Sequence, residues 1–336
     1  MDEIARVPWN GLRVASTFSG CGGSSLGYRM AGFKVVWANE FIPEAVKTYK
    51  ANHPDTFMNA QSIRTISPDQ LLKEARVKHG ELDLLDGSPP CASFSLSGKT
   101  DKHWGKAKKY SDTFQRVDDL FFEFTRILRG VSPRAFIAEN VASLSYGKAK
   151  GVYLEVLETM KGCGYVVGSV IIDAQWCGVP QTRARLIFIG FRNDLGITPT
   201  FPKPLTHRFT LADALANVPT GSVVEKETWI EKYSIGRRWD ALRQGQQDKK
   251  RFNLCRCSMN LPCPAVLQTG GCPGSASITH PTEKRKFSIA ELRSICGFPH
   301  DFKLTGKYRQ QYERLGRAVA PPMMKMVSSH VAGVLG

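Results

Sequence analysis

The stretch that decides the fold is LRVASTFSGCGGSSLGYRMAGF, residues 12–33. It begins as a short apolar run that ends at Phe18, passes through a glycine-rich turn, and continues over 24–31 with helical spacing. Glycines in such a turn let the backbone approach a ligand closely, and the N-terminus of the following helix favours anionic groups. The stretch therefore predicts a strand, a ligand-binding turn and a helix.

The same alternation of strands and helices continues along the chain. Further apolar runs occupy 33–38, 82–85, 135–138, 166–173 and 186–191, and helix-like segments occupy 43–52, 118–128 and 153–163. This order predicts an α/β fold with a doubly wound, mostly parallel sheet. From residue 193 the pattern changes to Pro, Gly and polar residues with short strands. We expect a large domain over 1–192, a smaller irregular β-rich domain over 193–285, and C-terminal helices over 286–336 that return to the first domain.

The charge of the chain is its most unusual compositional property. Among 336 residues, 46 are Lys or Arg and 30 are Asp or Glu, which gives a net charge of +16. Residues 1–98 hold ten basic and ten acidic side chains, 99–190 hold fourteen and nine, and 191–336 hold twenty-two and eleven. This excess suggests a polyanionic partner, with nucleic acid as the first candidate.

Other features of the composition favour a globular protein of a reducing compartment. Apolar residues make up 42% of the chain, but no run approaches the roughly 18–20 residues that span a bilayer. Residues 1–10 lack the apolar stretch of a signal peptide. The nine cysteines are scattered rather than regularly spaced. We therefore expect a cytoplasmic protein without a membrane segment.

Chemically useful residues follow several of the predicted strands. Glu40 ends the second strand, where a carboxylate can bind a ribose diol, and Cys91 follows a rigid turn at Pro89 and Pro90. Glu139 ends a later strand, while Arg183 and Arg185 lead into another and share a face by the period-two rule. A nucleophile, an acid and a cation at one sheet edge form a plausible reaction centre.

In this order the motifs resemble those of the DNA (cytosine-5)-methyltransferase family. The resemblance covers about 1–192 and 262–336. It rests on Phe18-x-Gly20-x-Gly22-Gly23, Pro90-Cys91, Glu139-Asn140-Val141, Gln181-x-Arg183-x-Arg185, Arg293-x-x-x-Gly297-Phe298-Pro299 and Gly316-x-Ala318-Val319-x-Pro321-Pro322. The resemblance implies an S-adenosylmethionine-dependent, Rossmann-like enzyme that methylates cytosine C5 in a specific short duplex sequence.

The family also implies a role for each matching residue. Cys91 would attack C6 of a flipped cytosine, Glu139 would act at N3, and Arg185, with Arg183, would hold O2 and a nearby phosphate. The expected contacts to S-adenosyl-L-methionine are Phe18, Gly20, Gly22, Gly23, Glu40, Pro89, Leu120, Arg317, Ala318 and Val319. The resemblance also implies that residues 193–285 are the target-recognition domain. The expected contacts to double-stranded DNA are Lys99, Lys102, Lys106, Lys108 and Lys109 after the catalytic cysteine, and Arg237, Arg238 and Arg243 in this domain.

Two positions depart from the family pattern. Ser62 stands where an acidic residue usually contacts the adenine, and Arg317 replaces the usual Asn near the methionine end of the cofactor. A guanidinium beside a cationic sulfonium is unfavourable unless an anion intervenes. Arg317 therefore either pairs with a local carboxylate or the cofactor's own carboxylate, swings out to DNA, or accepts carboxy-S-adenosyl-L-methionine as donor, in which case carboxymethyl would be transferred.

Several alternatives stay open at the level of sequence. Cys255, Cys257, Cys263 and Cys272 lie within eighteen residues, but they lack paired C-x-x-C spacing, so ordinary buried cysteines are favoured over zinc. A tRNA substrate and an inactive DNA-binding regulator are the competing functions. The tRNA branch's Cys-Phe-Thr signature is not evident, and intact Cys91, Glu139 and Arg185 argue against inactivity. We expect a monomer in a bacterial or phage-infected cell, with a cognate restriction enzyme as a candidate partner.

Overall fold

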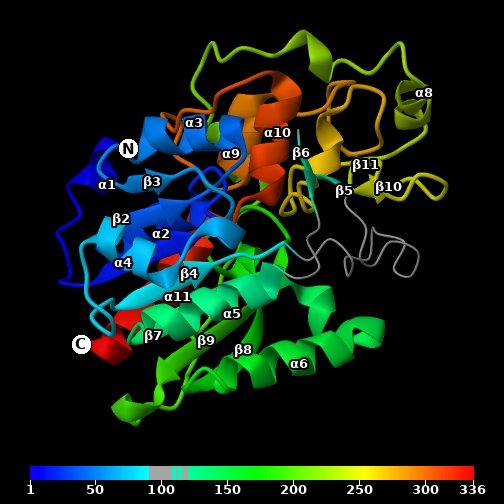
Figure 1. Ribbon diagram of the computed structural model, residues 1–336. Coiled ribbons are helices and arrows are strands. Elements are labelled where there is room, and N and C mark those ends of the chain that lie inside the picture. The colour runs from blue at the N-terminus through cyan, green and yellow to red at the C-terminus, as the bar shows by residue number, and fades with distance from the viewer. Residues whose placement is uncertain (91–107, 111–112, 116–119) are drawn as a thin grey trace.

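The computed structural model describes residues 1–90, 108–110, 113–115 and 120–336 (Figure 1). The helices are α1 (Asp2–Ala5), α2 (Gly23–Met30), α3 (Pro43–Asn52), α4 (Pro68–Ala75), α5 (Leu120–Val131), α6 (Lys150–Lys161), α7 (Leu211–Ala216), α8 (Ser234–Asp240), α9 (Ile289–Ile295), α10 (Tyr308–Arg317) and α11 (Pro321–Leu335). The strands are β1 (Arg13–Thr17), β2 (Lys34–Asn39), β3 (Phe57–Asn59), β4 (Leu84–Gly87), β5 (Lys108–Tyr110), β6 (Thr113–Gln115), β7 (Ala135–Val141), β8 (Tyr165–Asp173), β9 (Ala184–Arg192), β10 (Gln246–Gln247), β11 (Cys255–Arg256) and β12 (Ile278–Thr279).

A seven-stranded sheet with the order β3-β2-β1-β4-β7-β9-β8 forms the centre of the larger part of the molecule. The strands from β3 to β7 pair in parallel, whereas β9 runs antiparallel to both β7 and β8. Because β1 lies inside the sheet, the chain winds first toward β3 and then back past β1 toward β8. The predicted doubly wound, mostly parallel sheet is therefore confirmed.

Helices cover both faces of this sheet, and alternate strand residues face each layer. In β7, Phe136 and Ala138 pack with helices α4, α5 and α6, while Ala135 and Ile137 pack with α2 and α11. The pleat of a strand places successive side chains on opposite faces, so a strand buried on both sides reads as a continuous apolar run. The C-terminal α11 lies against α2, so the end of the chain completes the layer that α2 begins (Figure 1).

Residues 193–285, called the recognition region below after the role expected of them from the sequence, fold into short elements. They comprise α7, α8 and the three-stranded sheet β10-β11-β12, with a small apolar cluster that includes Ile230, Ile235, Trp239 and Leu254. In Figure 1 this region lies at the upper right, next to α9 and α10. Among the described residues, no helix is long and apolar enough to cross a membrane.

Candidate active site

The predicted site residues gather at the carboxyl edge of the parallel strands. The turn at 18–23 follows β1, Glu40 follows β2, Pro89 follows β4, and Glu139 lies near the end of β7. Parallel strands bring their carboxyl ends to one edge, which is where open α/β sheets bind ligands. Because β9 is antiparallel, its first residues reach the same edge, and Arg185 pairs with Val141 in the register.

The turn between β1 and α2 requires glycine at two positions. Gly20 has a φ of +55° and Gly22, the N-cap of α2, has a φ of +94°. Both values lie in the left-handed region, which disfavours residues with a Cβ atom. A Cβ on Gly20 would meet no atom of the described residues within 4 Å, so this point of the turn is open on their side. The turn therefore offers bare backbone to a ligand.

Glu40 fixes this turn and keeps acceptor capacity for a ligand. Its Oε2 accepts from the Gly20 amide at 3.1 Å, and its Oε1 accepts from the Ile42 amide at 2.8 Å. Burial raises the pKa of the Glu40 carboxyl, and the backbone hydrogen bonds oppose that rise. Each carboxylate oxygen has a second lone pair, so the group can still accept from a diol.

Glu139 and Arg185 form an ion pair at the adjacent strand ends. Arg185 Nε lies 2.7 Å from Glu139 Oε1, and Glu139 is only 8% exposed. Residue 185 is opposite Val141, two positions beyond Glu139, so both side chains point to the same face. The structure thus brings together an acid and a cation that were predicted to contact one substrate.

Asn140 connects β7 to the turn that leads to Cys91. Its Nδ2 donates to the Pro89 carbonyl at 3.1 Å, and its Oδ1 accepts from the Val141 amide at 2.8 Å. This residue was noted in the sequence only as part of a motif, and its role depends on a contact across 51 positions. The hydrogen bond fixes Pro89 beside the carboxylate of Glu139. Cys91 itself lies outside the described residues.

Arg183 has a different environment from Arg185. Its guanidinium donates to the backbone carbonyls of Val266, Gly316 and Ala318 at 2.9 to 3.2 Å, and the residue is 5% exposed. Burial lowers the pKa of Arg183 to about 9, and the Arg185 charge adds to that effect. Through these hydrogen bonds, Arg183 links the start of β9 to the C-terminal motif at 316–322.

Arg317 forms an ion pair within its own helix. Its Nη2 lies 2.6 Å from Glu313 Oε1, one turn earlier in α10. Pairing with a local carboxylate is one of the alternatives that the sequence left open for Arg317. It also supplies the anion that the Arg317 charge needs, so the argument for an additional carboxylate on the cofactor loses its basis. The neighbouring Ala318 and Val319 pack against Gly23, where a Cβ would lie 2.3 Å from the Val319 carbonyl oxygen.

The family model described as C-5 cytosine-specific DNA methylase matches residues 12–332. The chain belongs to this family. The enzyme is therefore a DNA cytosine-5 methyltransferase, as its motifs predicted. It is 31% identical to the type II methyltransferase M1.HphI of Haemophilus parahaemolyticus, over 95% of this chain and 86% of the relative, and 29% identical to M.NgoPII of Neisseria gonorrhoeae, over 95% of each.

Solved structures agree with the methyltransferase fold. A structure described as a DNA modification methyltransferase encoded within an Escherichia coli prophage superimposes with a TM-score of 0.75 at 21% identity, over 96% of this chain and 98% of that one. A Spodoptera frugiperda DNMT2 mutant gives a TM-score of 0.69 at 20% identity, over 97% and 99% of the two chains. At these identities, the likeness concerns the fold.

Asp86 is a residue of the methyltransferase that the sequence reading did not single out. It lies in β4, is 1% exposed, and accepts from the Ser16 hydroxyl at 2.6 Å and the Tyr28 hydroxyl at 3.1 Å. Burial raises the pKa of Asp86 to about 7, the two hydrogen bonds oppose the rise, and the Glu139 charge adds to it. The sequence did contain a signal for Asp86: it is an acidic residue at the end of an apolar strand, just before Pro89 and Pro90.

The remaining predicted residues occupy varied positions. Leu120 begins α5 and is buried in the core cluster that also contains Ile63, and Phe18, with a φ of +53°, packs against the same cluster. Ser62 is the N-cap of a short 3-10 helix. Lys99, Lys102 and Lys106 lie outside the described residues, and Lys108 and Lys109 fall on β5.

The four clustered cysteines are all among the described residues. Cys257 and Cys263 are buried with their sulfur atoms 3.9 Å apart, and Cys255 and Cys272 are half-buried. Among the described residues, no group of three or more potential ligands is close enough to hold a metal ion. A hydrogen bond with Cys257 and, after it, burial raise the pKa of the Cys255 thiol.

Proposed function

We propose that this methyltransferase transfers a methyl group from S-adenosyl-L-methionine to C5 of a flipped cytosine in a specific short sequence of double-stranded DNA. The observation that carries the proposal is the Glu139–Arg185 pair at the carboxyl edge, beside the hydrogen bond that fixes Pro89. The open turn at Gly20 and the two remaining acceptor sites of Glu40 fit the nucleoside part of such a cofactor. The cofactor supplies an electrophilic methyl group.

The residues of the chain then have distinct tasks. The Cys91 thiolate adds to C6 of cytosine, which makes C5 nucleophilic. Glu139, in its protonated form, gives a proton to N3 and takes it back when the ring is restored, while Arg185 holds O2, so that electron density moves to C5 rather than accumulating elsewhere on the ring. After C5 is methylated, loss of the C5 proton to a base and departure of the Cys91 thiolate restore the aromatic ring. None of these groups reaches a stacked base, so the cytosine must leave the helix.

The donor group is methyl in this proposal. Carboxymethyl transfer was motivated only by the Arg317 charge, which Glu313 now balances. A tRNA substrate and an inactive regulator are less well supported, because the family match concerns DNA and Glu139 and Arg185 are in place together. A cytoplasmic monomer that acts beside a cognate restriction enzyme remains part of the proposal, as does a bacterial or phage origin.

The test is covalent trapping on a DNA duplex that contains 5-fluorocytosine. Fluorine at C5 prevents the final elimination, so the wild-type protein should form an adduct that survives denaturing electrophoresis, and Cys91→Ser should form none. Cys163→Ser is the matched control, because this thiol follows α6 at the opposite edge of the sheet. Nucleoside mass spectrometry of modified DNA should show 5-methylcytosine. Absence of the adduct with active cofactor present, or a carboxymethyl product, would contradict the proposal.

A further inference from the structure

The seven arginines of the recognition region divide into two groups. Four make contacts that fix the fold. Arg238 pairs with Asp248, Arg256 stacks on Trp239 and donates to two carbonyls, Arg285 pairs with Glu283 and Glu291, and Arg208 lies over Trp176. The side chains of Arg237, Arg243 and Arg251 make no ion pair or hydrogen bond with any described residue. The unengaged arginines are the ones available to a ligand.

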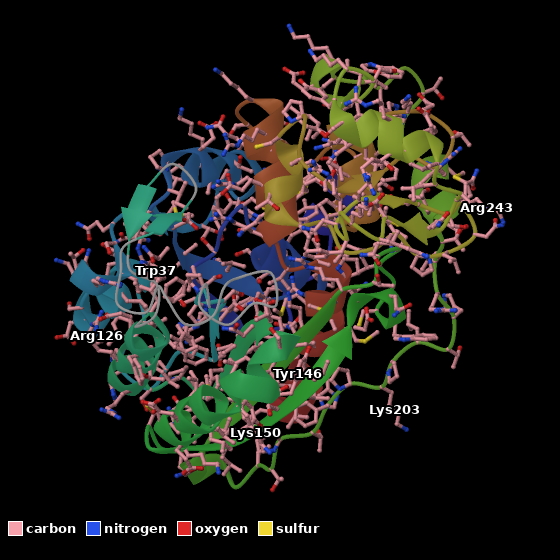
Figure 2. All side chains as sticks on the ribbon, turned by 90° about the vertical axis from the view of Figure 1, so that its right-hand side faces the viewer. Trp37, Arg126, Tyr146, Lys150, Lys203 and Arg243 are labelled. Atoms are coloured by element: carbon pink, nitrogen blue, oxygen red, sulfur yellow. The ribbon has the colours of Figure 1, made fainter. Side chains whose placement is uncertain are left out.

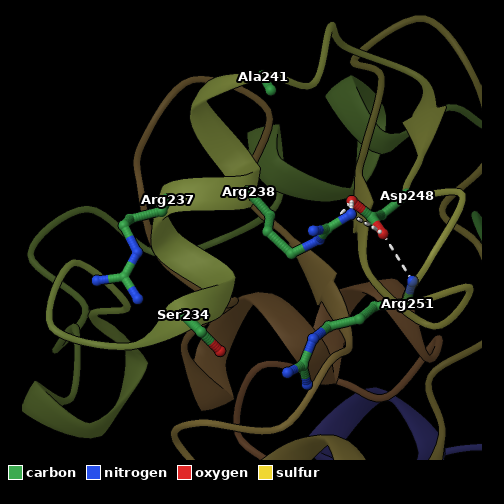
Figure 3. Close-up of a pocket in the computed structure, with 6 residues that line it drawn as sticks. All are labelled: Ser234, Arg237, Arg238, Ala241, Asp248 and Arg251. Carbon is green, nitrogen blue, oxygen red and sulfur yellow. Dashed lines mark hydrogen bonds and ion pairs between the residues drawn. The ribbon is translucent and has the colours of Figure 1, made fainter.

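Two of these unengaged arginines line one pocket. The pocket has a volume of about 440 Å³ and is lined by Ser234, Arg237, Arg238, Ala241, Asp248 and Arg251. Figure 3 shows Arg238 turned toward Asp248, while Arg237 and Arg251 lie on either side of Ser234. One aspartate against three arginines leaves the pocket with a positive charge, which suits hydrogen-bond acceptors or anions.

The Arg238–Asp248 pair fixes the backbone that carries Arg251. Asp248 is 6% exposed and receives the Arg238 guanidinium through two hydrogen bonds of 2.8 and 2.9 Å. The same carboxylate accepts from the backbone amides of Lys250 and Arg251 at 2.8 and 2.6 Å. An arginine on a fixed backbone loses less conformational entropy when it binds, and its geometry becomes more selective.

The neighbouring residue adds a second kind of contact. Phe252 follows Arg251 directly and is 63% exposed, which is unusual for a large aromatic side chain. Lys249 and Lys250 precede it on the same exposed loop. Cations beside an exposed aromatic match the mixed surface of DNA, where acceptor edges and phosphates alternate with apolar base and sugar groups.

We propose that Arg237 and Arg251 form a clamp that holds hydrogen-bond acceptors of the DNA substrate, and that Arg238 is a positioning residue that acts through Asp248. This inference rests on the proposed function and assigns its DNA-reading residues. It removes Arg238 from the expected DNA contacts and adds Arg251 to them. A guanine edge and a backbone phosphate both present the required acceptors, and the experiment separates these two sources.

The experiment uses the full-length protein on a random-sequence duplex library with S-adenosyl-L-methionine, and bisulfite sequencing reports which cytosines are methylated. Wild type should yield a recognition motif. If the acceptor is a guanine edge, Arg251→Ala should relax the motif at one guanine position by about tenfold to a hundredfold. If it is a phosphate, Arg251→Ala and Arg237→Ala should lower methylation equally at all sequences and each reduce the salt slope of binding by about one.

Lys203→Ala is the matched control, because Lys203 is an exposed cation of residues 193–285 that lies outside the pocket, has no ion pair with any described residue, and is well separated from Arg243 in Figure 2. It should keep the motif and lose only a little rate. Clamp variants that behave like Lys203→Ala or wild type would overturn the proposal. An inactive wild type would instead overturn the proposed function.

The positioning role of Arg238 has its own readout. Asp248→Asn should reproduce the effect of Arg251→Ala, on the same motif position or on the same salt slope, and Arg238→Lys should do so in part. A merely structural pair would lower the melting temperature and leave both the motif and the salt slope unchanged. That result, measured by thermal unfolding alongside the sequencing, would reject the positioning role.

Discussion

At the scale of single residues, the proposed chemistry depends on one ion pair. Glu139 is nearly buried and bonded to Arg185, so the carboxylate is held in one orientation before substrate arrives. Preorganised groups of this kind need little rearrangement when charge develops in a reaction. The neighbouring Asn140 donates a hydrogen bond to the Pro89 carbonyl, which also fixes the turn that precedes Cys91.

Glu139→Gln should keep the fold and lose most of the reaction rate. The amide has the shape of the carboxyl group but no proton to transfer to N3, so we expect single-turnover methylation to fall by about 10²- to 10⁴-fold. Glu158→Gln is the matched control, because Glu158 is an exposed residue of α6 that pairs only with Lys161 among the described residues. Rates for Glu139→Gln within twofold of wild type would remove Glu139 from the chemistry.

Asp86 should make the stability of the protein depend on pH. Its pKa is raised by burial from 3.8 to about 7 in the folded state, so between these values the folded state holds a proton that the unfolded state has lost. The contribution of Asp86 to the free energy of unfolding is therefore fully present below about pH 4 and is lost as pH rises through 7. Urea unfolding at pH 5 and pH 8 should show this loss in wild type and not in Asp86→Asn. Equal pH dependence in both proteins would exclude Asp86 as the source.

At the scale of elements, the start of α2 packs closely against the segment that precedes α11. Gly23 begins α2, and a Cβ there would lie 2.3 Å from the Val319 carbonyl oxygen and 3.2 Å from Phe298. Gly23→Ala should therefore push α2 away from the C-terminal motif and destabilise the fold by about 1–3 kcal/mol. Gly333→Ala in α11 is the control, since a Cβ there meets no described atom within 4 Å and alanine favours a helix. Urea unfolding of both variants measures the difference, and equal stability would contradict the close approach.

The sequence was informative about elements for a physical reason. Strands buried on both faces, such as β7, are continuous apolar runs, and their ends are marked by polar residues that serve the site, such as Glu139. β3, by contrast, has only three residues and α4 is polar on one face, so neither was predicted. The sequence also did not indicate which residues contact each other in the fold. Nothing in it predicts that Arg238 pairs with Asp248, or that Arg183 donates to the Gly316 carbonyl.

At the scale of the whole molecule, the charge is distributed unevenly along the chain. Residues 1–98, which contain Glu40 and the turn proposed to hold the cofactor, carry as many acids as bases, while residues 191–336 carry twice as many bases as acids. Many of the basic side chains in 191–336 make contacts within the protein. Arg285 pairs with Glu291, for example, and Arg256 donates to the Pro281 carbonyl. The charge available to DNA is thus smaller than the net +16 and is concentrated in fewer places.

This distribution leads to a prediction about salt. If about six phosphates are neutralised on binding, the logarithm of DNA affinity should fall with the logarithm of salt concentration with a slope of about −5, a loss of about 10³-fold between 50 and 200 mM. Cofactor binding at the neutral edge should change far less over the same range. Fluorescence anisotropy of a labelled duplex and calorimetry of the cofactor would measure the two slopes. A shallow slope for DNA would mean that the excess charge does not face the duplex. A steep slope for both DNA and the cofactor would mean that the charge acts across the whole molecule rather than through the recognition region.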